Sequence, residues 1–280
     1  MAELPLEPHF ALALIRSCDD DISCSKEMLT VISMLSVENP FVSPANKREH
    51  AANAHSRFTA PSGDHLTLLN LYASFESECL AGAAGSRWGG EGGNAMTKKW
   101  LADNFINGRA MRRAVKIRKQ LLERCSQLGM PIVSCQDRRV SGVRGGSTTS
   151  FMTSAEGDES VRRGLVAGLF LRTAEMLPGV HDDEDSMEAQ DRKKGKRRTR
   201  GGAEYTRRKF KTMTEGIEVS VHPGSSLFSR RRQDEMGAAG RRRKHFVVFT
   251  ELVLTKKAYM RGVSNIDGAW LRELAPQCFS

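Results

Sequence analysis

A row of positive charge runs through residues 109–128, and these side chains are the first candidates for chemistry. On a helical wheel the cationic and the apolar side chains of this stretch separate onto opposite faces. The cationic face carries Arg109, Arg112, Arg113, Lys116 and Lys119, and the apolar face carries Met111, Ala114, Val115, Ile117, Leu121, Leu122, Cys125 and Leu128. Such a row of cations can bind successive phosphates of a nucleic acid. A solvated charged face without a ligand fits the same pattern equally well.

Arg118 departs from this pattern, because the wheel places it inside the apolar face. An unpaired buried charge is very costly, so this guanidinium needs a carboxylate or a phosphate as its partner. We favour an internal ion pair over a direct RNA contact. Replacing Arg118 by Met is therefore expected to lower folding stability more than RNA affinity.

The sequence contains none of the patterns that commonly mark a catalytic centre. The phosphate-binding pattern G-x-x-x-x-G-K-[ST] is approached only at 142–148, which lacks the lysine. The Asp-Glu pairs lack the fourth residue of a D-E-x-H or D-E-x-D box, and no G-x-S-x-G elbow occurs. His50 and His55 are five residues apart, so they do not share a helix face as metal ligands would. We expect no catalytic residue, no metal site and no cofactor in this chain.

The composition points to an anionic partner. The chain has 280 residues, with 43 Lys and Arg against 33 Asp and Glu, and a formal net charge of +10. This excess favours RNA or DNA first and an anionic membrane second. No apolar stretch reaches the length of a membrane-spanning helix and no signal peptide is recognised, so we expect no membrane partner. The six cysteines form no C-x-x-C pair and indicate reduced thiols of an intracellular protein.

The first half of the chain has a helical period of apolar residues, which predicts an all-α block over residues 9–130. Asp64 is expected to cap a central helix that continues to Phe75. The glycine-rich stretch 82–93 is expected to be a loop. The basic helix is expected to begin near Gly108 and to end at Gly129.

The second half alternates in a way that is typical of strands. Asp158 is expected to cap a short helix, and strands are expected over 217–221, 246–255 and 259–266, before a helical turn at 268–274. Short strands with one or two helices fit a small β-barrel. Polar or charge-rich stretches at 137–157, 179–212 and 229–244 indicate disordered insertions. The predicted fold class is therefore α+β.

Eight blocks, in order, resemble the C-terminal part of DEAH-box ATP-dependent RNA helicases. The most specific block is Gly63–Tyr72, with the sequence GDHLTLLNLY. The others are Leu4–Pro8, Cys24–Ser36, Phe105–Met111, Ile117–Leu121, His222–Phe228, Glu251–Arg261 and Ile266–Pro276. The resemblance implies four successive parts: the remnant of a winged-helix domain at 1–8, a ratchet-like helical domain at 9–130, a linker or insertion at 131–157, and an OB-fold-like domain at 158–280 with insertions at 179–212 and 229–244.

In that family the ratchet and OB domains line the RNA channel and receive activators such as G-patch proteins. The ATP and Mg²⁺ sites of the family belong to two RecA-like motor domains, and this chain has no counterpart of the motor motifs. The resemblance therefore implies the accessory, RNA-binding half of a helicase that remodels RNA or ribonucleoproteins in pre-mRNA splicing or ribosome biogenesis. The alternatives are a motorless module that binds RNA or a helicase activator, and a protein scaffold.

The resemblance and the charge pattern together nominate nine RNA-contacting residues. They are Asn107, Arg109, Arg112, Arg113, Lys116, Ser225, Ser226, Lys256 and Lys257. Asn107 also fits a helix cap, and the two serines also fit a turn. Tyr259 and Phe249 fit the base-stacking platforms of an OB fold, although strand alternation places one of them in the core.

The basic run at 192–200 fits three roles: a nuclear or nucleolar address, a non-specific RNA tether and a solubilising loop. We expect a nuclear or nucleolar location, with the cytoplasm as a further compartment.

Overall fold

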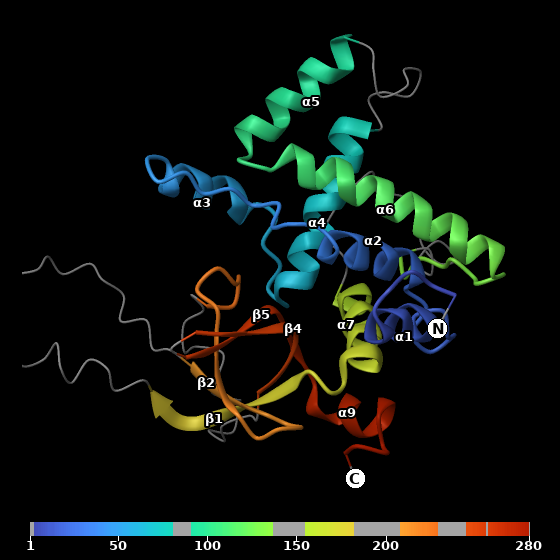
Figure 1. The fold of residues 1–280 in the computed structure, drawn as a ribbon, viewed down its shortest axis with the longest axis vertical. Helices are drawn as coiled ribbons and strands as arrows, with labels where there is room; N and C mark the ends of the chain where they lie inside the picture. The colour runs from blue at the N-terminus through green and yellow to red at the C-terminus, as the bar shows by residue number, and fades with distance from the viewer. Residues whose placement is uncertain are drawn as a thin grey trace, which may run out of the picture.

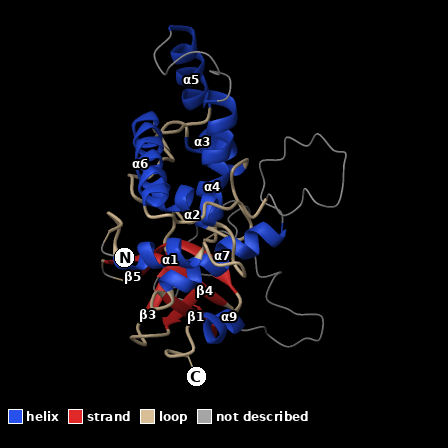
Figure 2. Cartoon of the chain, turned by 90° about the vertical axis from the view of Figure 1, so that its right-hand side faces the viewer, coloured by secondary structure: helices blue, strands red, loops and turns tan. Residues whose placement is uncertain are grey.

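The structure of the chain is a computed structural model that describes residues 3–80, 91–136, 155–181, 208–228, 245–255 and 257–279. Helices dominate one end of the molecule, and the strands gather at the other (Figures 1 and 2). The helices are α1 (Pro8–Arg16), α2 (Ser25–Leu35), α3 (Arg48–Ser56), α4 (Asp64–Phe75), the π-helical turn η1 (Glu76–Leu80), α5 (Glu91–Asp103), α6 (Gly108–Gln127), α7 (Ala155–Leu169) and α9 (Gly268–Leu274). This helical block followed by a barrel confirms the predicted α+β class.

Five strands close into a barrel in the order β1-β2-β3-β5-β4. They are β1 (Thr173–His181), β2 (Arg208–Thr212), β3 (Glu218–Val221), β4 (Phe246–Leu254) and β5 (Ala258–Ile266). Only β3 and β5 pair in parallel, and the other described pairs are antiparallel. Alternate apolar side chains of the strands fill the interior, so that each strand hides one face inside the barrel.

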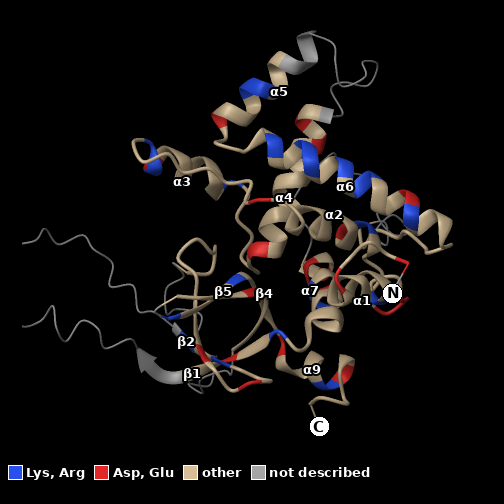
Figure 3. Cartoon of the chain, viewed as in Figure 1, with Lys and Arg blue, Asp and Glu red and all other residues tan. Residues whose placement is uncertain are grey.

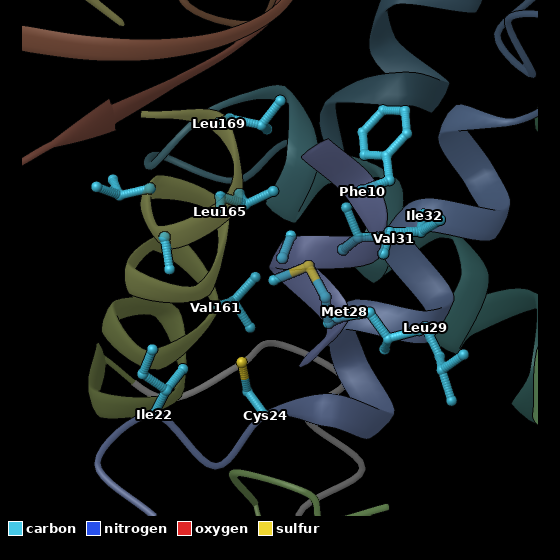
Figure 4. Close-up of a cluster of buried hydrophobic side chains, with 14 of the residues drawn as sticks. Phe10, Ile22, Cys24, Met28, Leu29, Val31, Ile32, Val161, Leu165 and Leu169 are labelled. Atoms are coloured by element: carbon cyan, nitrogen blue, oxygen red, sulfur yellow. The ribbon is translucent and has the colours of Figure 1, made fainter. Parts of the chain in front are cut away.

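Two apolar cores hold the helices. The first is shared between the two ends of the chain, because it joins α1 and α2 to α7, α9 and β4. Figure 4 shows Val161 of α7 facing Met28 of α2 within this core. Gly168 lets α7 approach α1 closely, since a Cβ atom there would lie 2.4 Å from the carbonyl oxygen of His9. The second core joins α4, α5 and α6 around Phe75.

The structure corrects the predicted start of two helices. Asp64 is the first residue of α4, and the capping position belongs to Gly63, which has a φ of 131°. Helix α7 begins at Ala155, three residues before Asp158, so Asp158 lies in the first turn rather than at the cap. Its carboxylate accepts a hydrogen bond from Ser62 at 2.6 Å.

Two stretches that the sequence predicts to be loops contain regular secondary structure. Helix α5 begins at Glu91, inside the glycine-rich stretch at 82–93. Strand β2 lies inside the predicted insertion 179–212, and its Phe210 is buried in the barrel. This strand forms although it is rich in cations, because β1 and β3 pair with its two edges. The predicted insertion 229–244, residues 137–154 and residues 182–207 lie outside the described residues.

Candidate nucleic-acid interface

Helix α6 presents its cations as the sequence predicts. Asn107 caps the helix, and its side-chain oxygen accepts hydrogen bonds from the amides of Arg109 and Ala110 at 3.0 and 3.3 Å. The helix ends before Gly129, whose φ of 67° suits a residue without a side chain. Met111, Ala114, Leu121 and Cys125 are buried, whereas Arg109, Arg112, Arg113, Lys116 and Lys119 are exposed. Lys and Arg accordingly colour much of the length of α6 in Figure 3.

We define the α6 basic face as Arg109, Arg112, Arg113 and Lys116. Lys119, one turn further along, lies 3.9 Å from Glu123. Among the side chains that the structure describes, no carboxylate forms an ion pair with a member of the α6 basic face. Four cations on two turns of a helix whose other side is packed form a fixed, uncompensated patch, which attracts a polyanion.

Asn107 already has partners within the chain. Besides capping α6, it donates a hydrogen bond from its side-chain nitrogen to Glu38 at 3.2 Å. The helix-cap interpretation of this residue therefore accounts for its contacts in the structure. Its contact with RNA stays a prediction.

Arg118 is half-buried, but its partner differs from the one predicted. Its Nε donates to the hydroxyl of Thr30 at 2.8 Å, and its guanidinium carbon lies 5.5 Å from the centre of the Tyr72 ring. No described carboxylate forms an ion pair with it, so the predicted internal ion pair is wrong. A hydroxyl and an aromatic face satisfy the cation instead, because Arg118 keeps enough exposure for water to solvate the rest of the group.

Replacing Arg118 by Met is expected to lower the free energy of unfolding by about 1–2 kcal/mol, through loss of one hydrogen bond and one cation–π contact. The affinity for RNA is expected to change less than about twofold, because the guanidinium is held by contacts with α2 and α4 and lies apart from the α6 basic face. Urea unfolding and RNA titration of the same preparation measure both quantities. A variant of unchanged stability that binds RNA more weakly would reassign Arg118 to the RNA-binding surface.

On the barrel, Ser225 and Ser226 lie in the turn after β3. The hydroxyl of Ser225 accepts a hydrogen bond from the amide of Leu227 at 3.2 Å. The amide and the hydroxyl of Ser226 both donate to Oδ1 of Asp64, at 2.7 and 2.8 Å. Both donors of Ser226 therefore already hold a carboxylate from the helical block.

Of the two predicted lysines, Lys257 lies at the β4–β5 turn. The carbonyl oxygen of Lys257 accepts hydrogen bonds from the amide and the hydroxyl of Thr255, at 2.9 and 3.0 Å, and these bonds shape the turn. Lys256 lies outside the described residues. The turn is at the tip of a long hairpin, because β4 and β5 pair from Phe246, opposite Ile266, to Leu254, opposite Ala258.

The two aromatic candidates separate as strand alternation predicts. Phe249 is 3% exposed and lies in the barrel core. Tyr259 is half-buried, and the ring of His222 meets it edge-on, with the ring centres 6.0 Å apart. Of the two, only Tyr259 has part of its surface outside the core.

No sequence pattern predicts the contacts between helix α4 and the barrel. The other carboxylate oxygen of Asp64, Oδ2, accepts a hydrogen bond from the amide of Val263 at 2.8 Å. His65 is fully buried beside it and lies 2.7 Å from the hydroxyl of Ser264 through Nδ1. No local pattern could reveal these contacts, because the partners are 162 to 199 residues apart in the sequence.

The hydrogen bonds define the tautomer of His65. The hydroxyl of Thr250 donates to the carbonyl of Gly262, so it accepts from the Nε2–H of His65 at 3.2 Å. Nδ1 then accepts from the hydroxyl of Ser264. Burial of this neutral ring lowers the pKa of His65 from 6.5 to about 4, and the carboxylate of Asp64 opposes that shift only in part.

Stability is consequently expected to fall in mild acid. Because the folded-state pKa of His65 lies below the unfolded value of 6.5, the unfolded chain takes up the proton first as the pH drops from about 6.5 to about 4. Roughly 2–3 kcal/mol of folding free energy is lost over this window. Urea unfolding at several pH values, compared with a His65→Gln variant, measures this contribution. If both chains lose the same stability between pH 7 and 4.5, the effect does not come from His65.

Two features are absent from the residues that the structure describes. No helix among them combines the length and the apolar composition needed to cross a bilayer. No three or more of their His, Cys, Asp or Glu side chains come together as a site for a metal ion.

The structure joins a helical block to a closed five-stranded barrel, and comparison with known families identifies both parts. Residues 7–68 match the helicase-associated domain (HA2), ratchet-like, and residues 161–278 match the oligonucleotide/oligosaccharide-binding (OB)-fold. The chain corresponds to the C-terminal portion of DEAH-box RNA helicases.

Relatives of this family match the chain over its whole length. It is 31% identical to the ATP-dependent RNA helicase DHX33 of Homo sapiens and 31% identical to the pre-mRNA-splicing factor ATP-dependent RNA helicase DEAH10 of Arabidopsis thaliana. It is 29% identical to the pre-mRNA-splicing factor ATP-dependent RNA helicase prp22 of Schizosaccharomyces pombe. The chain spans 29%, 30% and 17% of the length of these three proteins, respectively.

Proposed function

We propose that this chain is the RNA-binding, accessory half of an ATP-dependent RNA helicase, and that single-stranded RNA runs along the α6 basic face towards the barrel. The observation that carries the proposal is the set of four exposed cations without a described carboxylate partner, on a helix fixed by its packed side. Because the relatives are named as RNA helicases, we propose RNA as the polyanion that binds this face.

The spacing of the cations suits a phosphate backbone. Arg109 and Lys116 are seven residues apart, which is about 10 Å along a helix axis. Arg112 and Arg113 lie between them, so the face can contact two or three successive phosphates. On the barrel, Lys257 and Tyr259 would extend the path, the lysine by contacting a phosphate and the tyrosine by stacking on a base.

The remaining parts of the reaction would come from outside this chain. ATP and Mg²⁺ would act in motor domains that this sequence does not contain. Those motor domains and G-patch-type activators are the protein partners that we propose. Two of the relatives are named as pre-mRNA-splicing factors, which supports a nuclear or nucleolar place of action.

A salt titration tests RNA binding. The affinity of the purified chain for a fluorescent single-stranded RNA is expected to fall with a slope of about −2 to −3 in log K against log salt, because each of three or four phosphate contacts, two or three on α6 and one on the barrel, contributes about 0.7. Fluorescence anisotropy at several salt concentrations measures the slope. Absence of binding at about 0.1 M salt would contradict the proposal and favour a protein scaffold.

A motorless module that binds RNA or a helicase activator is the second candidate, because no motor motif occurs in the 280 residues. An immunoblot of the endogenous protein with an antibody against Gly63–Tyr72 separates the two. A band several times heavier than 31.0 kDa would support the helicase, and a band near 31.0 kDa would support the module.

A further inference from the structure

The helical block and the barrel are attached to each other at two places. The first is the apolar core in which α7 packs against α1 and α2 and also touches β4 and β5. The second is polar and lies at the start of α4, where that helix meets β5 (Figure 1). We call the segment Ser62–His65 the α4 joint.

The backbone of the α4 joint runs against β5 like a short extra strand. Gly63 forms an isolated antiparallel bridge with Ser264, and the carbonyl of Ser62 accepts a hydrogen bond from the amide of Asn265 at 2.8 Å. A Cβ atom on Gly63 would lie 2.4 Å from the carbonyl oxygen of Val263, so the two segments of backbone approach each other to a distance that only glycine allows.

Asp64 extends the contacts of the α4 joint from β5 to the turn after β3. One of its oxygens holds the amide and the hydroxyl of Ser226, and the other holds the amide of Val263. A single carboxylate therefore accepts three hydrogen bonds and ties the turn after β3 to β5. Hydrogen bonds to a charged acceptor are stronger than neutral ones, which makes Asp64 the main polar contact of the joint.

Helix α4 also connects the joint to α6, the helix that carries the α6 basic face. Two turns after His65 it carries Tyr72, whose ring lies beside Arg118 of α6. The far side of Arg118 is held by Thr30 of α2. Helix α4 thus connects the proposed RNA-binding helix to the proposed RNA-binding barrel.

We propose that Asp64 is a positioning residue for RNA binding: it holds the barrel at a defined orientation to α6, so that one RNA strand can contact both surfaces at once. The inference rests on the proposed function. Without this carboxylate, the turn after β3 would lose the hydrogen bonds that tie it to α4, and this side of the barrel could shift relative to α6. Two surfaces held at a defined distance act as a bivalent site, whose advantage depends on geometry and disappears when the geometry is lost.

The experiment compares a short and a long RNA on the same variants. An oligonucleotide of about 4 nucleotides covers one surface, and one of about 16 nucleotides can span both. The wild-type chain is expected to bind the long RNA about a hundredfold more tightly than the short one. In Asp64→Asn, an amide donor faces an N–H donor of either Val263 or Ser226, so the joint loosens. The advantage of the long RNA is expected to fall to about tenfold or less, while the affinity for the short RNA stays within about twofold.

Asp267→Asn is the matched control, because it makes the same change of charge and also removes a capping carboxylate, which accepts from the amide of Ala269 at 2.9 Å. Asp267 precedes α9, and its described side-chain hydrogen bond goes to α9 and not to the α4 joint. This variant should keep the full advantage of the long RNA. If Asp64→Asn does not fold, as judged by circular dichroism, Ser226→Ala carries the test, since it removes only one of the three bonds and should reduce the advantage partially.

Three outcomes would overturn the inference. If folded Asp64→Asn keeps the full advantage of the long RNA, Asp64 does not position the barrel and the proposed function stands. An equal loss of affinity for the short and the long RNA would mean a general structural defect rather than positioning. If the wild-type chain binds neither RNA, both the inference and the proposed function fail.

Discussion

Reversing the charge of the α6 basic face is expected to abolish most RNA binding by this chain. The variant Arg109→Glu, Arg112→Glu, Arg113→Glu, Lys116→Glu should bind single-stranded RNA about a hundredfold or more weakly than the wild type at about 0.1 M salt, because the phosphate contacts of α6 are replaced by repulsion. The slope of log K against log salt should become shallower by about 2, for two or three lost contacts. Anisotropy titrations at several salt concentrations give both numbers.

The fold is expected to tolerate these substitutions. All four side chains are exposed, Glu forms helices about as well as Arg and Lys, and a carboxylate in the first turn interacts favourably with the helix dipole. Four reversals elsewhere, at the exposed residues Lys26, Arg48, Lys211 and Arg272, form the matched control, because they change the net charge equally. If the control loses as much affinity as the α6 variant, RNA is bound by net charge and not by α6.

Replacing Gly63 by Ala is expected to destabilise the chain by about 4 kcal/mol, because steric overlap adds to backbone strain. The new Cβ atom would lie 2.4 Å from the carbonyl oxygen of Val263 and 2.5 Å from the Cα atom of Ser264. Both neighbours are backbone atoms of β5, so they cannot rotate away. The φ of 131° adds strain for any residue with a side chain.

Gly129→Ala separates the two contributions. Gly129 also has a positive φ, of 67°, but no atom lies within 4 Å of the position of a new Cβ. This variant should lose only about 1–2 kcal/mol, the cost of a left-handed backbone. Urea unfolding of the two variants measures the difference, and equal losses would mean that the α4 joint does not touch β5 as closely as described.

Local patterns predict the elements whose partners lie nearby in the sequence. Helix α6 is an example, because its period alone separates Met111 and Leu121 from the cations opposite. The wheel also shows that Arg118 turns inward. It cannot show that Thr30 and Tyr72 are the partners, since these lie on other helices and the wheel describes only one.

Features that depend on distant pairing escape such patterns. Strand β2 has one buried apolar side chain, Phe210, among cations, and it is a strand because the barrel closes through it. Asp64 has the residue type of a helix cap, but it is the first residue of α4, and its partners come from β5 and from the turn after β3. The sequence thus predicts the proposed RNA-binding helix, and the structure reveals the joint that orients the barrel to it.

Photo-crosslinking shows where RNA lies on the chain most directly. A single-stranded RNA that carries 4-thiouridine would be crosslinked to the purified chain, and the modified peptides would be identified by mass spectrometry. We expect crosslinks in residues 107–119 of α6 and in the β4–β5 hairpin around Tyr259. Crosslinks confined to α1 and α9, with none on α6, would contradict the proposed RNA path.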